Sequence, residues 1–141
     1  MKKQSVMNSK FHHIGMACCS IDDTAQFYLS MGYQLSDTIF DPIQNVNIAF
    51  LNKENETCIE LIEPCDDNSP VTSILKKNGT SPYHLCYKVD NIEVAINEMK
   101  LQKFIRIGRI ALASAMENGK ICFMYSRDKG LIELYEPNEF K

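Results

Sequence analysis

Apolar and polar residues alternate in several short segments of the chain, and other segments repeat apolar residues at helical spacing. Phe11–Cys18 alternates, which predicts a strand with His13 and Gly15 on one face. Ser20-Ile-Asp-Asp is a capping sequence for a helix that continues to about Met31. Further strands are then predicted over Tyr33–Ile39, Val46–Leu51 and Thr57–Glu63.

The second half of the chain repeats this order. A strand over Tyr83–Val89 precedes a helix opened by Asp90-Asn-Ile-Glu93. Strands follow near Phe104–Arg109, Lys120–Ser126 and Gly130–Glu136. Between the halves, Cys65–Ser81 is rich in Asp, Asn, Ser, Pro and Gly, which predicts a linker. Within it, Ser69-Pro70 can start a short helix that ends before Gly79.

The two halves also share sequence. Ile48–Pro64 aligns without a gap with Ile121–Pro137, at an offset of 73 residues. The identical pairs are Ile48/Ile121, Phe50/Phe123, Ile59/Ile132, Glu60/Glu133, Leu61/Leu134, Glu63/Glu136 and Pro64/Pro137. A weaker match places His13–Ile21 over His84–Ile92, at an offset of 71 residues. Two nearly equal offsets in the same order indicate two copies of one supersecondary unit.

This duplication predicts an α+β fold in which residues 1–141 form a single domain made of two βαβββ modules. The first module covers residues 11–64, the linker with its short helix 65–81, and the second module 82–137. Tandem units of this kind can pair their sheets about a pseudo-twofold axis and form a half-open barrel of mixed β-sheet. Residues at equivalent positions then face each other across the barrel.

Two pairs of equivalent residues carry chemistry, namely His13 with His84 and Glu60 with Glu133. Glu60 shares a strand face with Cys58, so its carboxylate enters an apolar face, which is costly unless it is paired, protonated or bound to a metal. Two imidazoles and two carboxylates form a mixed N/O site suited to Zn, Ni, Co, Fe or Mn. One choice of strand register brings both pairs inward, which predicts a metal site.

Other polar and aromatic residues near these positions are predicted to be structural. His12 is expected to point to the opposite face of its strand from His13. Glu63 and Glu136, which precede prolines at strand ends, are expected on solvated surface as part of the fold signature. Two residues are expected to pack under the sheet, Tyr83 and Tyr87. Three cations near the expected mouth of the barrel could meet anionic groups of a ligand, but they are expected to be solvated loop charges: Arg106, Arg109 and Lys120.

The composition excludes several classes of protein. The chain has 141 residues, 45% of them hydrophobic, and a net charge of −3, which argues against a non-specific nucleic-acid binder. No apolar run approaches the ~20 residues that span a bilayer, and polar residues interrupt the segment after Met1-Lys-Lys, so a cytoplasmic protein is expected. The six cysteines form no Cys-x-x-Cys pair and are expected to be free thiols.

From Phe11 to Pro137 the chain resembles the vicinal oxygen chelate superfamily, which includes glyoxalase I, methylmalonyl-CoA epimerase, extradiol dioxygenases and bleomycin-resistance proteins. The motifs that carry the resemblance are His13-Ile-Gly-Met-Ala, Ile59-Glu-Leu-Ile-Glu-Pro, Asp67-Asn-Ser-Pro, Pro82-Tyr-His-Leu-Cys-Tyr-Lys-Val-Asp and Gly130-Leu-Ile-Glu-Leu. In metal-dependent members the first and fourth strands of each module supply one ligand each. The resemblance therefore implies one divalent ion, with Ni, Co or Zn favoured, bound by His13, Glu60, His84 and Glu133.

The leading interpretation is a metal-dependent lyase of the glyoxalase I type, because glutamate at both carboxylate positions is similar to the bacterial enzymes. The implied substrate is the hemithioacetal of methylglyoxal with glutathione or another thiol. Glu133 would act as the principal base and Glu60 as a second proton carrier, while the metal stabilises the enediolate. An arginine associated with glutathione binding in many glyoxalases has no clear match at Met16–Cys18.

Methylmalonyl-CoA epimerase, an isomerase that acts on an acyl-CoA thioester, is the alternative. Glu60–Asp90 resembles this epimerase and also small bacterial proteins classed as glyoxalase I. Two loops depart from the epimerase pattern, since Pro42-Ile-Gln-Asn45 replaces a Pro-Glu-Gln-Gly-like loop and Ala113–Gly119 replaces a Gly-x-His-Gly-like loop. Ile48 stands where some epimerases carry a free glutamate.

A non-catalytic binding protein of the bleomycin-resistance type is the third interpretation. Such proteins commonly lack the ligand set, so the complete set favours catalysis. An extradiol dioxygenase would need further acid–base histidines, and only His12 remains. A homodimer with a complete site in each chain is expected.

Overall fold

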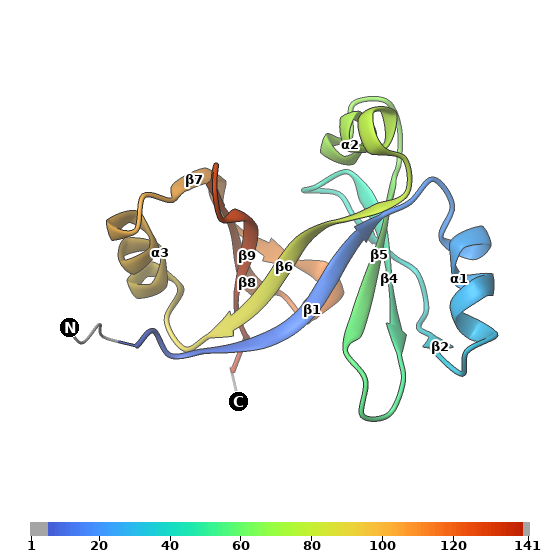
Figure 1. Cartoon of the computed structure of the whole chain (residues 1–141), viewed down its shortest axis with the longest axis horizontal. Helices are drawn as coiled ribbons and strands as arrows, with labels where there is room; N and C mark the ends of the chain where they lie inside the picture. Colours follow the sequence, from blue (N-terminus) through green and yellow to red (C-terminus); the bar gives the residue numbers. More distant parts are fainter. Residues whose placement is uncertain (1–5, 140–141) are drawn as a thin grey trace.

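The computed structural model describes residues 6–139; residues 1–5, which include the Met1-Lys-Lys start, and residues 140–141 lie outside the described part. The described strands form one mixed sheet in the order β2-β4-β5-β1-β6-β9-β8-β7, with β3 paired to β4. Figure 1 shows β1 and β6 side by side across the middle of an open sheet, with α1 and α3 at its two ends. This is the glyoxalase-like α+β architecture, as predicted.

The first half of the chain contains one helix and five strands. Their bounds are β1 (Ser9–Ala17), α1 (Ile21–Leu29), β2 (Gln34–Leu35), β3 (Ile39–Asp41), β4 (Val46–Asn52) and β5 (Cys58–Pro64). The single strand expected over residues 33–39 is wrong, because pairing with β4 is interrupted there. The hydroxyl of Ser36 accepts a hydrogen bond of 2.8 Å from the backbone N–H of Phe50 in the gap between β2 and β3.

The second half begins with α2 and otherwise follows the same order. Its elements are α2 (Pro70–Asn78), β6 (Ser81–Val89), α3 (Ile92–Leu101), β7 (Ile105–Ala113), the 3-10 turn η1 (Ser114–Met116), β8 (Gly119–Ser126) and β9 (Gly130–Glu136). Strand β7 continues beyond the predicted end at Arg109. The Ala113–Gly119 loop therefore reduces to η1 and two left-handed residues, Glu117 and Asn118.

The repeated glutamates Glu63 and Glu136 hold the starts of the two outer helices. Oε2 of Glu63 accepts a hydrogen bond of 2.9 Å from the backbone N–H of Ile21, the first residue of α1. Oε1 of Glu136 accepts the equivalent bond, also 2.9 Å, from Ile92 in α3. The expectation of solvated surface is wrong for both, since a carboxylate at a helix N-terminus satisfies an otherwise unpaired N–H and interacts favourably with the helix dipole.

The apolar core lies mainly between the sheet and these two helices. One cluster joins α1 to Leu51 and Leu61, and a second joins α3 to Met124 and Leu134. The opposite, inner face of the same strands carries the polar residues of the candidate site. All six cysteines are free, as predicted. No helix within residues 6–139 is long and apolar enough to cross a membrane.

Candidate metal centre

The four predicted ligands meet at the centre of the sheet because of the register of four adjacent strands. In the antiparallel pair of β1 and β6, Gly15 lies opposite His84 and His13 lies opposite Cys86. In the flanking parallel pairs, Gly15 lies opposite Glu60 on β5 and Cys86 lies opposite Glu133 on β9. The histidines and glutamates of both halves are thus brought to one point.

The ligand atoms of His13, Glu60, His84 and Glu133 all lie within 4.8 Å of one another. Nε2 of His13 is 3.1 Å from Oε1 of Glu60 and 3.2 Å from Oε1 of Glu133. Nε2 of His84 is 3.5 Å from Oε1 of Glu60 and 3.2 Å from Oε1 of Glu133. None of the four side chains is more than 3% exposed.

These atoms form close ion-pair contacts, but the contacts do not have the geometry of hydrogen bonds. Nε2 of both histidines and Oε1 of Glu133 are buried and have no hydrogen-bond partner among the described residues. Leaving buried polar atoms unpaired is costly. Two nitrogens and two oxygens that face a common point fit a divalent ion of the Zn, Ni or Co type.

The pKa values of the histidines and of the glutamates are shifted in opposite directions. Burial lowers the pKa of both histidines, but close contacts with Glu133 and Glu60 outweigh it and raise each pKa to about 9. Burial raises the pKa of both glutamates, but the histidines outweigh it, lowering that of Glu60 and bringing that of Glu133 to about 2. In the metal-free protein, two imidazolium ions therefore balance two carboxylates, and a divalent ion would replace two protons without changing the net charge.

Gly15 makes room for His84. A Cβ atom at residue 15 would lie 2.0 Å from Cε1 of His84, so the ring occupies the space in which a side chain would start. The residue pattern does not single out Gly15 as functional. However, an isolated glycine inside an apolar strand is a known signal of close approach by another group.

Two β-bulges turn further side chains toward the centre. Between the pairs Phe11/Tyr87 and His13/Cys86, β1 holds the extra residue His12. Between Gly15/His84 and Met16/Pro82, β6 holds the extra residue Tyr83. His12 and Tyr83 are also equivalent in the sequence repeat, each directly preceding a histidine ligand.

The bulges overturn the predicted orientation of both residues, because alternation of side chains fails where an extra residue is inserted. Nδ1 of His12 lies 2.7 Å from Nδ1 of His13. The ring of Tyr83 meets the ring of His84 edge-on, with centroids 4.6 Å apart. His12 is therefore not on the opposite face, and Tyr83 does not pack under the sheet.

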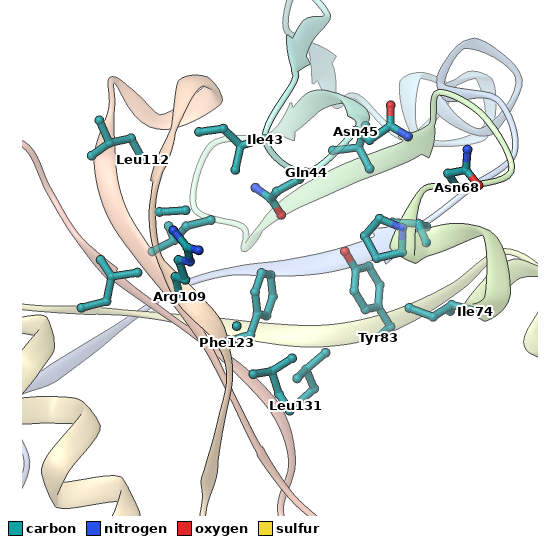
Figure 2. Close-up of a pocket in the computed structure, with 18 residues that line it drawn as sticks. Ile43, Gln44, Asn45, Asn68, Ile74, Tyr83, Arg109, Leu112, Phe123 and Leu131 are labelled. Carbon is teal, nitrogen blue, oxygen red and sulfur yellow. The ribbon is translucent and has the colours of Figure 1, made fainter.

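A cavity of about 770 Å³ adjoins the centre. Figure 2 shows Tyr83 and Phe123 between residues of the α2 side, such as Ile74, and Arg109 on β7. Phe123 also packs against the ring of His84, with centroids 5.2 Å apart. Leu131 lines the cavity, and Glu133 follows two residues later on the same face of β9.

Only one of the three cations expected near the mouth of the barrel lines the larger cavity. Arg109 lines the cavity, whereas Arg106 and Lys120 are not among its lining residues. Nζ of Lys120 instead lies 3.8 Å from Oε2 of Glu136.

A second, smaller cavity of about 350 Å³ lies at equivalent positions of the repeat. Its lining includes His12, Phe50 and Cys58, which correspond to Tyr83, Phe123 and Leu131 of the larger cavity. Glu60 follows Cys58 by two residues on the same strand face. Neither Glu60 nor Glu133 is itself among the residues that line either cavity.

Comparison with known proteins places this geometry in a family. Residues 12–123 match the profile of the glyoxalase/bleomycin resistance protein/dioxygenase superfamily. The chain belongs to this superfamily. It is 32% identical over 136 residues to the mitochondrial methylmalonyl-CoA epimerase of Homo sapiens, covering 92% of this chain and 76% of the human protein.

Two solved structures share the fold over nearly the whole chain. A hypothetical protein of Bacillus halodurans aligns with a TM-score of 0.83 and 32% identity, covering 95% of this chain and 98% of that one. A methylmalonyl-CoA epimerase in complex with methylmalonyl-CoA and NH4+ aligns with a TM-score of 0.79 and 23% identity, covering 93% and 96%.

These relatives correct the predicted activity. The expectation of a glyoxalase I that acts on a hemithioacetal is wrong, since the named relatives are methylmalonyl-CoA epimerases, which are isomerases and not lyases. The physical reason is that the same four residues could support proton transfer next to a carbonyl in more than one substrate, so the residues around them select the substrate. The comparisons favour the alternative interpretation of the sequence, which was an epimerase.

Proposed function

We propose that this protein epimerises the α-carbon of an acyl-CoA thioester of the methylmalonyl-CoA class. The observation that carries the proposal is the convergence of Glu133 and Glu60 on one buried point, where the ligand atoms of both glutamates and both histidines lie within 4.8 Å of one another. An epimerase must remove a proton from one side of a carbon and return it to the other. The similarity to methylmalonyl-CoA epimerases supports the same chemistry.

In the proposed reaction, Glu133 takes the α-proton, and the bonding electrons move into an enolate of the thioester. Glu60 then delivers a proton to the opposite face of the carbon, which inverts its configuration. The lowered pKa of Glu133 keeps this carboxylate ionised, as a base must be. Glu60 would first take up a proton from solvent, which it then delivers to the carbon, and Glu133 would afterwards release the α-proton to solvent. A divalent ion held by His13, His84 and the glutamates would supply a Lewis acid that stabilises the negative charge of the enolate.

The surroundings of the site are consistent with these roles. Ile48 is buried in an apolar cluster with Val46 and Ile62, so β4 supplies no carboxylate at that position and Glu60 is left as the second proton carrier. The larger cavity is mostly apolar, which suits the acyl and thioester arm of CoA, and Arg109 can meet a phosphate. The homodimer, the cytoplasmic location and the identity of the metal remain predictions from the sequence.

The test is deuterium exchange at the α-carbon. Protein reconstituted with Co, Ni or Zn is incubated with one epimer of methylmalonyl-CoA in D2O, and both deuterium content and configuration are followed. We expect inversion with uptake of one deuterium, and a loss of roughly 100-fold or more in Glu133→Gln. His84→Ala should lose both metal and activity. Absence of exchange in the metal-loaded wild type would refute the proposal.

A further inference from the structure

His12 touches the metal centre through a ligand and not directly. Its Nδ1 lies 2.7 Å from Nδ1 of His13, the ring nitrogen on the far side from the carboxylates. The contact exists because the β1 bulge turns His12 to the same side of the strand as His13. The ring of His12 is half-buried and packs against Tyr135, with centroids 5.0 Å apart.

We propose that His12 is a positioning residue, which accepts the Nδ1–H of His13 and so holds the Nε2 lone pair of His13 toward the metal ion. A neutral imidazole carries a proton on only one of its nitrogens. If Nε2 binds the ion, the proton must be on Nδ1, and Nδ1 of His12 is the acceptor within reach. Such partners orient a ligand and increase its basicity.

The surroundings of His12 favour this role. Its ring is half-buried and meets the rings of His13 and Tyr135 edge-on, with centroids 5.0 Å apart in both contacts, so Nδ1 of His12 is held beside Nδ1 of His13.

The second histidine is held in a different way. Nδ1 of His84 has no hydrogen-bond partner within residues 6–139. Its bulged neighbour Tyr83 meets it edge-on, and its ring fills the space above Gly15. His84 is thus oriented by shape, and His13 by a hydrogen bond.

The inference rests on the metal site of the proposed function, but not on its substrate, so it is tested by Co²⁺ affinity without any turnover. His12→Phe keeps an aromatic ring and removes the acceptor. His12→Asn places Oδ1 where Nδ1 was. Tyr83→Phe is the matched control at the equivalent bulge.

We expect roughly 10- to 100-fold weaker Co²⁺ binding in His12→Phe, with substantial recovery in His12→Asn and no change in Tyr83→Phe. Equal affinity of wild type and a folded His12→Phe would overturn the proposal, as would a wild type that binds no Co²⁺.

A measurement on the wild type covers the case in which His12→Phe does not fold. Nitrogen-15 NMR of the zinc-loaded protein distinguishes protonated from unprotonated ring nitrogens. We expect a proton on Nδ1 of His13 and none on Nδ1 of His12. A proton on Nδ1 of His12 would overturn the proposal, whatever the affinity of the variants. Failure of the epimerase assay alone would leave both of these results unaffected.

Discussion

Gly15 and His84 lie opposite each other in the central strand pair, and the imidazole of His84 fills the space where a side chain of residue 15 would begin. The hydrogen atom of a glycine is the only substituent that this approach tolerates. His84 can therefore reach the carboxylates only because residue 15 is a glycine.

Gly15→Ala should displace His84 and weaken the metal site. We expect a loss of unfolding free energy of about 1–3 kcal/mol from overpacking, together with clearly weaker Co²⁺ binding. Urea denaturation and calorimetric titration measure the two effects. Cys86→Ala, at the equivalent position of the repeat, is the control, since it removes an atom and leaves the ring of His84 in place. Wild-type affinity in Gly15→Ala would contradict this account.

Metal binding should release protons. Because the pKa of each histidine is raised to about 9, both are protonated near neutral pH, and a divalent ion must displace one proton from each. Calorimetry in two buffers of different ionisation enthalpy should therefore report the release of two protons. The affinity should rise with pH up to about 9 and then level off. Release of no protons near neutral pH would show that the histidines are already neutral.

The same shifts predict how the stability of the metal-free protein depends on pH. The folded pKa of each histidine lies above the ordinary 6.5, so this stabilisation is complete below pH 6.5 and is lost as the pH rises through about 9. The stabilisation that comes from the lowered pKa of Glu133 is present above pH 4.5 and is lost as the pH falls through about 2. Thermal unfolding should show a melting temperature that falls from pH 6.5 to 9 without metal. With saturating metal, the fall should be much smaller.

Glu63→Ala should destabilise the fold without affecting the metal centre. The loss of the carboxylate leaves the N–H of Ile21 unpaired at the start of α1, at a cost of about 1 kcal/mol. Glu56→Ala, in an exposed turn, is the control. Urea denaturation should show a lower midpoint for Glu63→Ala alone, while both variants bind Co²⁺ normally. An unchanged midpoint would mean that the bond contributes nothing.

Arg109→Gln should raise the KM of an acyl-CoA substrate and leave kcat nearly unchanged. Arg109 lines the cavity on β7, whereas the four predicted metal ligands lie on β1, β5, β6 and β9. For an exposed ion pair the increase should be roughly 2- to 5-fold and should shrink at high salt. Arg106→Gln is the matched control, because Arg106 does not line the cavity. An equal increase of KM in both variants would mean that the overall positive charge of the protein attracts the substrate and that Arg109 makes no specific contact with a phosphate.

Much of the fold and the ligand set could be predicted from the chain itself. Periodicity placed the main helices and strands, because burial of one face requires apolar residues at the spacing of a helix or a strand. The duplication selected His13 with His84 and Glu60 with Glu133, and the structure brings these four together. The division into modules 11–64 and 82–137 stays a prediction of that duplication.

The tertiary structure alone decided the orientation of the residues around those ligands. His12 and Tyr83 face the centre because each bulge adds one residue between strands that are far apart in sequence, and alternation within a single strand does not reveal such a shift. Glu63 and Glu136 meet helix starts that lie more than forty residues away along the chain. The cavities likewise depend on how β7, α2 and the turn before β4 close over the sheet. A sequence records which residues prefer burial, whereas the distances between remote side chains are set only when the strands pair.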